Sequence, residues 1–267
     1  MKTYKRISGP YLLWQLVFIL VPVFLIFYFA FTQNGAFSLA NFREIGTAQM
    51  MTSFYKSIKM AAITTLICLL LAYPVAYIIS QIKLDYQQTA LMLVVIPMWM
   101  NFLLRTYSWI TLLSRTGIIN NVLGSLGIAP LDLLYSEGAV LLGMVYNFLP
   151  FMILPIYTIL EKMDKSLIEA AKDLGANQAT TFIRVILPLS MPGIMSGISM
   201  VFIPCISTFE ITTLLGGNKM NLVGNIIEQQ FTVTGNWNYG SALSMVLMVF
   251  LVISILFSKD EDKAEKK

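Results

Sequence analysis

The side chains that most often carry out catalysis are scarce in this sequence. It contains no histidine, which excludes His-based metal sites, a Ser-His-Asp triad and a histidine proton relay. Its two cysteines, Cys68 and Cys205, lie inside apolar runs, where a thiol usually acts as a small hydrophobic group. It also contains no G-x-x-x-x-G-K-[ST] phosphate loop. We therefore predict a protein that is not an enzyme and binds no metal or cofactor itself.

A few charged and aromatic residues have types suited to contacting a cation. Glu210 is the one acidic residue inside a predicted membrane helix, and Arg105 lies in another. A charge at the bilayer centre costs about 2.5–3.5 kcal/mol, so such residues usually face a helix bundle or a wet cavity. Glu210 either contacts a cationic solute or forms a salt bridge with Arg105. Trp99 and Tyr107 either make cation–π contacts or mark the membrane interface, where both residue types are enriched.

The elements that position these residues follow from the distribution of charge. Only 12% of the 267 residues are charged and 57% are apolar or aromatic, against roughly 25% and 45–50% in soluble domains. Six stretches carry no charge: 7–42, 60–82, 86–104, 138–160, 185–209 and 229–258. A bilayer core about 30 Å thick needs about 20 helical residues, whereas barrel strands alternate over about 10. The sequence predicts an all-α polytopic membrane protein with six transmembrane helices in one domain, residues 1–267.

The spans are predicted at Tyr11–Phe31, Met60–Ile79, Leu91–Leu113, Val140–Ile159, Pro192–Leu214 and Ala242–Phe257. With the N-terminus inside, twelve of the 18 Lys and Arg residues fall on the cytoplasmic side, which favours both termini in the cytoplasm. Glu210 and Arg105 then lie toward the outer ends of their spans. Gly193 and Gly197 form a G-x-x-x-G pattern that predicts close helix contact. The charged tail, 258–267, is predicted to be solvated and partly disordered.

The largest inner loop, 161–191, carries its own helix signals. Ser166 and Glu169 have the spacing of a capping box, and Gly175 suits the left-handed position that ends a helix. An apolar stripe between them consists of Leu167, Ala170, Ala171 and Leu174, with Glu169, Lys172 and Asp173 on the polar side. A second helix is predicted over about Gln178–Leu187, capped by Asn177 and ending before Pro188. The alanines bury little surface, so the stripe suits another protein better than lipid.

The same loop resembles a known family. Glu169-Ala170-Ala171, Gly175, and Ile186-Leu187-Pro188 are similar to the E-A-A…G…I-x-L-P signature of permease subunits of binding-protein-dependent ABC transporters. Further similarity, to the B-type permeases of spermidine/putrescine importers, is carried by Ile96-Pro97-Met98-Trp99, Leu104-Arg105-Thr106-Tyr107, Glu161-Lys162-Met163-Asp164 and Leu215-Gly216-Gly217.

The resemblance implies the type I ABC importer permease fold (MetI-like) and import of polyamines across a bacterial inner membrane. It implies a second homologous permease, two copies of a cytoplasmic ATPase that uses ATP and Mg²⁺, and an extracytoplasmic substrate-binding protein. The ATPase-coupling residues would be Glu169, Ala170, Ala171, Asp173, Leu174, Gly175, Leu187 and Pro188.

Three alternatives to this function stay open. The chain could belong to the same family but serve another small solute. It could be an ion-coupled secondary transporter, although the scarcity of titratable groups in its spans argues against that. It could also be a membrane scaffold that binds partners without transport. The small excess of positive charge is explained by membrane orientation, so no nucleic-acid partner is expected.

Overall fold

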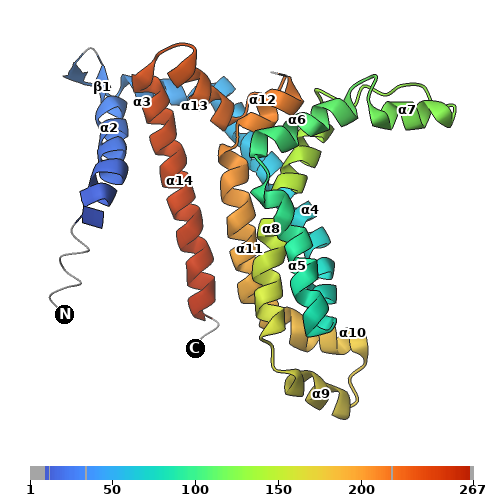
Figure 1. The fold of residues 1–267 in the computed structure, drawn as a ribbon. Coiled ribbons are helices and arrows are strands. Elements are labelled where there is room, and N and C mark those ends of the chain that lie inside the picture. Colours follow the sequence, from blue (N-terminus) through green and yellow to red (C-terminus); the bar gives the residue numbers. More distant parts are fainter. Residues whose placement is uncertain (1–9, 12, 34, 218, 265–267) are drawn as a thin grey trace.

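The computed structural model describes residues 10–11, 13–33, 35–217 and 219–264. Its elements are η1 (Leu16–Leu20), α2 (Val21–Ala30), β1 (Thr32–Gln33), β2 (Ala36–Phe37), α3 (Ala40–Ile45), α4 (Ala48–Gln81), α5 (Leu84–Trp99), α6 (Phe102–Leu113), α7 (Ile118–Ser125), α8 (Glu137–Glu161), α9 (Lys165–Asp173), α10 (Gln178–Thr181), η2 (Phe182–Ile186), α11 (Leu187–Ser207), α12 (Glu210–Gly216), α13 (Val223–Thr232) and α14 (Trp237–Ala264). Long helices run side by side in Figure 1, with α9 at one end and α6, α12 and α13 at the other.

The centre of the bundle is built from α4, α8 and α11, which make the most extensive helix contacts in the described chain. Small residues allow the close approach. A Cβ atom on Gly193 would lie 2.8 Å from the carbonyl oxygen of Pro155, and one on Gly197 would lie 2.6 Å from Met152 Sδ. The close helix contact predicted from these two glycines is therefore confirmed.

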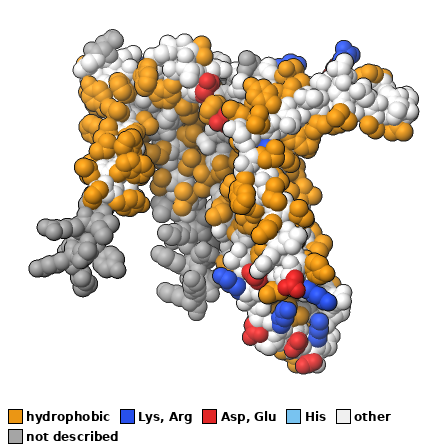
Figure 2. All heavy atoms as spheres, viewed as in Figure 1, with side chains coloured by type: hydrophobic (Ala, Val, Ile, Leu, Met, Phe, Trp, Pro, Cys, Tyr) orange, Lys and Arg blue, Asp and Glu red, His pale blue; other side chains and the backbone are white. Residues whose placement is uncertain are grey.

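Five described helical segments are long and apolar enough to cross a membrane: Leu13–Ala30, Ala48–Gln81, Glu137–Glu161, Gln178–Ser207 and Trp237–Ile255. The predicted total of six is reached when Leu84–Trp99 and Phe102–Ser125 are counted as one bent span. Figure 2 shows hydrophobic side chains along these helices and a cluster of acidic and basic side chains at the end that carries α9. The all-α polytopic fold is confirmed.

The prediction of one continuous span over Leu91–Leu113 is wrong. The chain turns by 90° between α5 and α6. Pro97 lies in the last turn of α5, and Met100 is extended. Asn101 then caps a new helix, because its side-chain oxygen accepts hydrogen bonds from the backbone N–H groups of Leu103 and Leu104 at 2.9 and 3.2 Å. This local cap starts α6 in a new direction.

The predicted span Pro192–Leu214 is also wrong at its C-terminal end. The helix stops at Ser207, Thr208 is extended, and Glu210 is the first residue of the separate helix α12. Asn225 on α13 stabilises the break by donating to the carbonyl oxygen of Phe209 at 3.2 Å. Glu210 therefore lies at the end of the bundle and not inside a span.

The helix predicted to end before Pro188 continues through it. Gln178–Ser207 is continuous, and the π-helical turn η2 directly precedes α11. Pro188 directly follows the π-helical turn and Leu187, and a proline is tolerated where such a turn interrupts the regular i→i−4 hydrogen bonds of a helix. The i→i+5 hydrogen bonds of a π turn hold one extra residue within the helix, so the side chains after the turn are rotated about the helix axis relative to those before it.

The first and last spans, α2 and α14, pack together beside the central helices. Asn238 on α14 joins them, because its side-chain nitrogen donates to the carbonyl oxygens of Phe29 at 3.1 Å and Thr32 at 2.6 Å. Helix α14 continues to Ala264, so most of the tail predicted as partly disordered is helical. The last three residues lie outside the described chain.

Candidate functional site

One end of the bundle carries the loop helix α9. Its N-cap is Asp164, whose Oδ1 accepts a hydrogen bond from the backbone N–H of Ser166 at 2.9 Å. The predicted cap at Ser166 is therefore wrong by two residues. The Ser166 backbone N–H holds the pKa of the Asp164 carboxyl below its ordinary value. Gly175 has the predicted left-handed conformation, with φ +83°, and its N–H donates to the carbonyl oxygen of Lys172 at 2.8 Å.

The predicted apolar stripe of α9 faces outward. Leu174 is 89% exposed and Leu167 is 46% exposed. Ala170 and the acidic residues Glu169 and Asp173 are exposed, and Ala171 is half-buried. Ile168 instead packs against the core of the bundle. Apart from the half-buried Ala171, the apolar stripe is thus exposed on the surface of this chain.

The two remaining residues of the predicted signature, Leu187 and Pro188, lie beyond α9 at the start of α11. Leu187 packs against the core, while Pro188 is exposed. Tyr73 and Tyr77 on α4 meet the ring of Phe182 edge-on, with centroids 5.6 and 5.9 Å away. These contacts connect the segment that follows the loop helices to the central bundle.

A hydrogen-bonded junction beside α9 was not anticipated from the sequence. The buried Gln87 on α5 donates to the carbonyl oxygens of Ser80 and Ile82 at 3.3 and 2.9 Å. Its own oxygen accepts from the hydroxyl of Tyr157 on α8 at 2.9 Å. A cavity of about 90 Å³ lined by Gln87 also has lining residues from α9. Gln87 lies in the charge-free stretch 86–104, and no local pattern marks it.

The opposite end of the bundle carries Arg105 on α6 and Glu210 on α12, and these two helices pack together. Arg105 is 7% exposed, its Nε and Nη1 have no hydrogen-bond partner, and its guanidinium lies 5.9 Å from the ring centre of Phe102. The one salt bridge in the described part of the chain joins Arg115 and Asp132 at 3.5 Å. Of the two interpretations of Glu210, the salt bridge with Arg105 is therefore not formed.

The two aromatic candidates lie on the surface of this bent region. Trp99 ends α5 and is 84% exposed, and Tyr107 on α6 is 52% exposed. The structure brings α6 and α12 together, but it leaves these two aromatic side chains on open surface.

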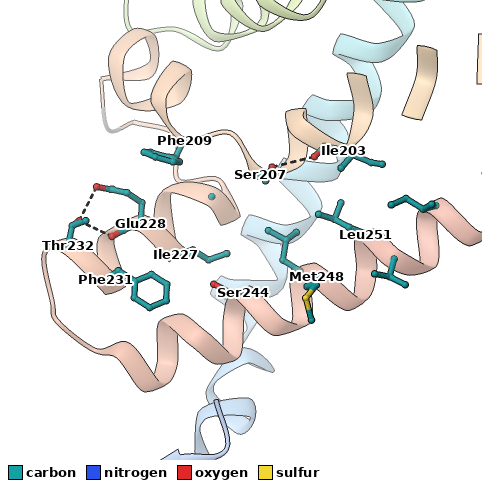
Figure 3. Close-up of a pocket in the computed structure, with 14 residues that line it drawn as sticks. Ile203, Ser207, Phe209, Ile227, Glu228, Phe231, Thr232, Ser244, Met248 and Leu251 are labelled. Carbon is teal, nitrogen blue, oxygen red and sulfur yellow. Dashed lines mark hydrogen bonds between the residues drawn. The ribbon is translucent and has the colours of Figure 1, made fainter. Parts of the chain in front are cut away.

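A cleft of about 590 Å³ lies between α11, α13 and α14 (Figure 3). Glu228 on α13 is the one charged residue that lines it, and the other lining residues are mostly apolar. The hydroxyl of Thr232 donates to Glu228 Oε1 at 2.9 Å. Sequence reasoning missed Glu228 because it lies outside every predicted span, although it directly precedes the charge-free stretch 229–258. Within the described residues, no group of three or more His, Cys, Asp or Glu could hold a metal.

A bundle of apolar spans, one of them bent, with a loop helix at one end is the architecture of a multi-pass membrane protein. The chain belongs to the family described as binding-protein-dependent transport system inner membrane component, whose model matches residues 86–259. It is thus a permease subunit of an ABC importer, and the type I importer fold expected from the sequence is confirmed.

Two curated relatives are similar over most of the chain. One is the spermidine/putrescine transport system permease protein PotB of Haemophilus influenzae, 41% identical over 251 residues, covering 91% of this chain and 88% of the relative. The other is the protein of the same name from Escherichia coli, 36% identical over 252 residues, covering 91% of this chain and 92% of the relative.

The fold is also similar to solved structures. A chain in the crystal structure of a bacterial ABC transporter that imports the acidic polysaccharide alginate has a TM-score of 0.85, with 17% identity, 99% of this chain and 96% of that chain covered. A second structure, of the alginate transporter with a pentasaccharide-bound periplasmic protein, gives a TM-score of 0.85, 17% identity and coverage of 99% and 95%. At this identity the likeness concerns the fold alone.

Proposed function

We propose that this permease subunit forms half of a translocation pathway for the polyamines spermidine and putrescine in a bacterial inner membrane. The observation that carries the proposal is the 36–41% identity, over 91% of the chain, to two permeases named for that transport. The other half of the pathway is a second homologous permease. An extracytoplasmic substrate-binding protein delivers the polyamine, and the alginate transporter with its periplasmic protein supports such a partner for this fold.

Helix α9 is the proposed docking point for one of two cytoplasmic ATPase copies, and the other copy docks on the second permease. The exposure of Leu167 and Leu174 supports this role, because an apolar stripe without a partner in its own chain is suited to burial against another protein. The ATPase uses ATP and Mg²⁺, whereas this chain binds neither. Closure of the ATPase pair changes the contacts at α9, and this difference in contact between states drives the cycle.

The proposed orientation has both termini and α9 in the cytoplasm. Twelve of the 18 Lys and Arg residues then lie inside, as the positive-inside rule requires. The end that carries α6, α12 and α13 faces outward, and Glu210, Arg105, Tyr107 and Trp99 are pathway candidates there. The exposure of Trp99 and Tyr107 supports contact with a passing cation.

Reconstitution in vesicles tests the function. The permease pair, ATPase and binding protein are expected to take up labelled spermidine only when the ATPase has access to ATP. Uptake driven by an ion gradient without ATP would instead identify a secondary transporter. Assembly with partners but no uptake of any polyamine would contradict the substrate assignment, and a panel of other small solutes would then identify the cargo.

A further inference from the structure

The chain carries a short arm at the end of the bundle opposite α9. The arm consists of α7 and the loop that leads from it to α8, and it projects sideways from the bundle beyond α6 (Figure 1). The segment Phe102–Ser125 lies at 90° to α5, which runs along α8 with the other spans. Because the spans cross the bilayer, a segment at a right angle to them runs along its surface. Helix α7 therefore lies in the plane of the membrane, at the level where the spans end.

Hydrogen bonds of one buried side chain hold the arm in a fixed shape. The side-chain nitrogen of Asn120 on α7 donates to the carbonyl oxygens of Ser114 and Leu131 at 3.1 and 3.0 Å. Its side-chain oxygen accepts from the backbone N–H of Leu131 at 2.8 Å. Asn120 thus joins the residue where α6 ends to the loop that follows α7, so α7 is fixed relative to both.

Helix α7 has an apolar face that its own chain leaves uncovered. Ile118 and Val122, one turn apart, are both more than half exposed, and so is Leu126, one turn further on. Ile119 and Leu123 lie beside them on the helix and are half-buried. At 100° per residue these five side chains cover an arc of about 140°, which is the width of the apolar face of an amphipathic helix.

The apolar surface of the arm continues the apolar surface of the spans. Figure 2 shows hydrophobic side chains along the side of the arm that is turned toward the spans, and basic side chains on the opposite side. Residues 116–131 include no charged residue, and the flanking Arg115 and Asp132 pair with each other at 3.5 Å. Contact with lipid would therefore rest on burial of apolar surface and gain nothing from the charge of the headgroups.

We propose that α7 is an interfacial helix whose apolar face is buried in the lipid leaflet at this end of the bundle. Ile118, Val122 and Leu126 contact the acyl chains just below the headgroups, whereas Asn121 and Gly124 on the other side of the helix stay in water. A free helix of eight residues would bind a membrane weakly, but α7 is joined to a span, so its contact with lipid is intramolecular. The contact ties α6, which packs on α12, to the membrane surface, whichever solute is carried.

The depth of α7 can be measured with a nitroxide label on the permease pair in phosphatidylcholine nanodiscs. Cys68 and Cys205 are buried, so the label attaches to an introduced thiol. Val122→Cys places it on the apolar face. Gly124→Cys is the matched control, because Gly124 lies about 200° further round the helix and a Cβ there meets nothing within 4 Å. The ratio of collisions with oxygen to collisions with a water-soluble nickel complex is expected to be severalfold higher at Val122 than at Gly124.

A charge placed on the apolar face tests the same contact. With the label on Ile118→Cys, Val122→Asp is expected to increase collisions with the nickel complex, because the carboxylate draws the face out of the lipid. Gly124→Asp adds the same charge on the water side and is expected to leave these collisions unchanged. The contrast between Val122 and Gly124 should also persist when part of the phosphatidylcholine is replaced by phosphatidylglycerol.

Three results would overturn the inference. Equal nickel collisions at Val122 and Gly124 would show that the arm stands in water. Exclusion of both oxygen and nickel from Val122 would show that a protein, such as the second permease, covers this face. A contrast that appears only with phosphatidylglycerol would show that headgroup charge, and not apolar burial, holds the arm. None of these results would bear on the proposed function, because uptake is not what they measure.

Discussion

The two ends of the bundle treat polar side chains in different ways. At the α9 end, neutral groups on different helices are bonded to each other: Gln87 with Tyr157, and the hydroxyl of Tyr73 with that of Ser190 at 2.8 Å. At the α6–α12 end, Asn225 on α13 likewise bonds Thr212 and Thr213 on α12, but Arg105 is also buried there with two unpaired nitrogens. A buried charge without a hydrogen-bond partner is therefore the feature that separates this end from the α9 end.

The largest effect is expected from Leu174→Asp, which tests whether the α9 end is a docking surface. Burying a leucine contributes about 1.5–3 kcal/mol, so ATPase affinity should fall about 10- to 100-fold. Folding should be unaffected because Leu174 is 89% exposed. The measurement is ATPase retained on the purified permease pair. Leu126→Asp, on an exposed residue of the loop after α7, is the matched control. Equal ATPase retention by the Leu174 variant and wild type would contradict docking at α9.

A smaller effect is expected from Gln87→Leu, which removes the junction beside α9. The Tyr157 hydroxyl and the carbonyl groups of Ser80 and Ile82 lose their partner, at a cost of about 1–3 kcal/mol. If the junction transmits motion, more ATP is hydrolysed for each polyamine imported. Tyr157→Phe breaks only the bond between Tyr157 and Gln87. It should therefore cause a smaller loss of stability and a smaller rise in the ATP hydrolysed for each polyamine. A lower thermal midpoint with an unchanged ATP-to-polyamine ratio would assign the junction to stability alone.

The two ends should respond to mutation with opposite signs of stability change. Arg105→Met removes a desolvated, unpaired guanidinium, so we expect the free energy of unfolding to rise by about 1 kcal/mol. Phe102→Leu, which removes only the neighbouring ring, controls for lost packing. Thermal unfolding in detergent or nanodiscs is the measurement. A different outcome would show that the two residues are paired in the dominant state. In that case Arg105→Met and Glu210→Gln would each destabilise the protein, and the double variant would be no less stable than either single variant.

The same contrast explains which parts of the fold were predictable from sequence. At the α9 end the signals are local: an apolar stripe, the cap of Asn177, and Gly175 in the left-handed region. Such signals act within one or two turns and need no knowledge of the neighbours. The error at Ser166 arose because Asp164 is an equally good cap two residues earlier. Charge-free length likewise located the four spans that are continuous helices over their predicted range, because the bilayer sets the length of a helix.

At the other end the decisive contacts are tertiary. Helix α11 stops at Ser207, where Asn225, 16 residues beyond Phe209, bonds the carbonyl oxygen of Phe209. The apolar run 185–209 continues past this stop without any change of composition, so periodicity could not place Glu210 outside the span. The cap at Asn101 lies inside the charge-free run 86–104, whose apolar length predicted one continuous span. Glu228 became visible only when α13 was placed against α11 and α14.

The smallest effect, at Asp164, separates cap geometry from charge at the α9 end. Its pKa is lowered in the folded state, because the charged form accepts the Ser166 N–H. The stabilisation of α9 is therefore fully present above the ordinary Asp value of 3.8 and is lost as pH falls through the lower folded pKa. Asp164→Ala should increase amide exchange in α9 by about threefold at neutral pH. Asp164→Asn keeps an acceptor oxygen but does not titrate, so its α9 should match wild type at neutral pH and keep that protection in acid, after correction for intrinsic exchange. If wild type and the Asn variant lose protection together in acid, α9 is released by other carboxyl groups and the Asp164 cap does not control it.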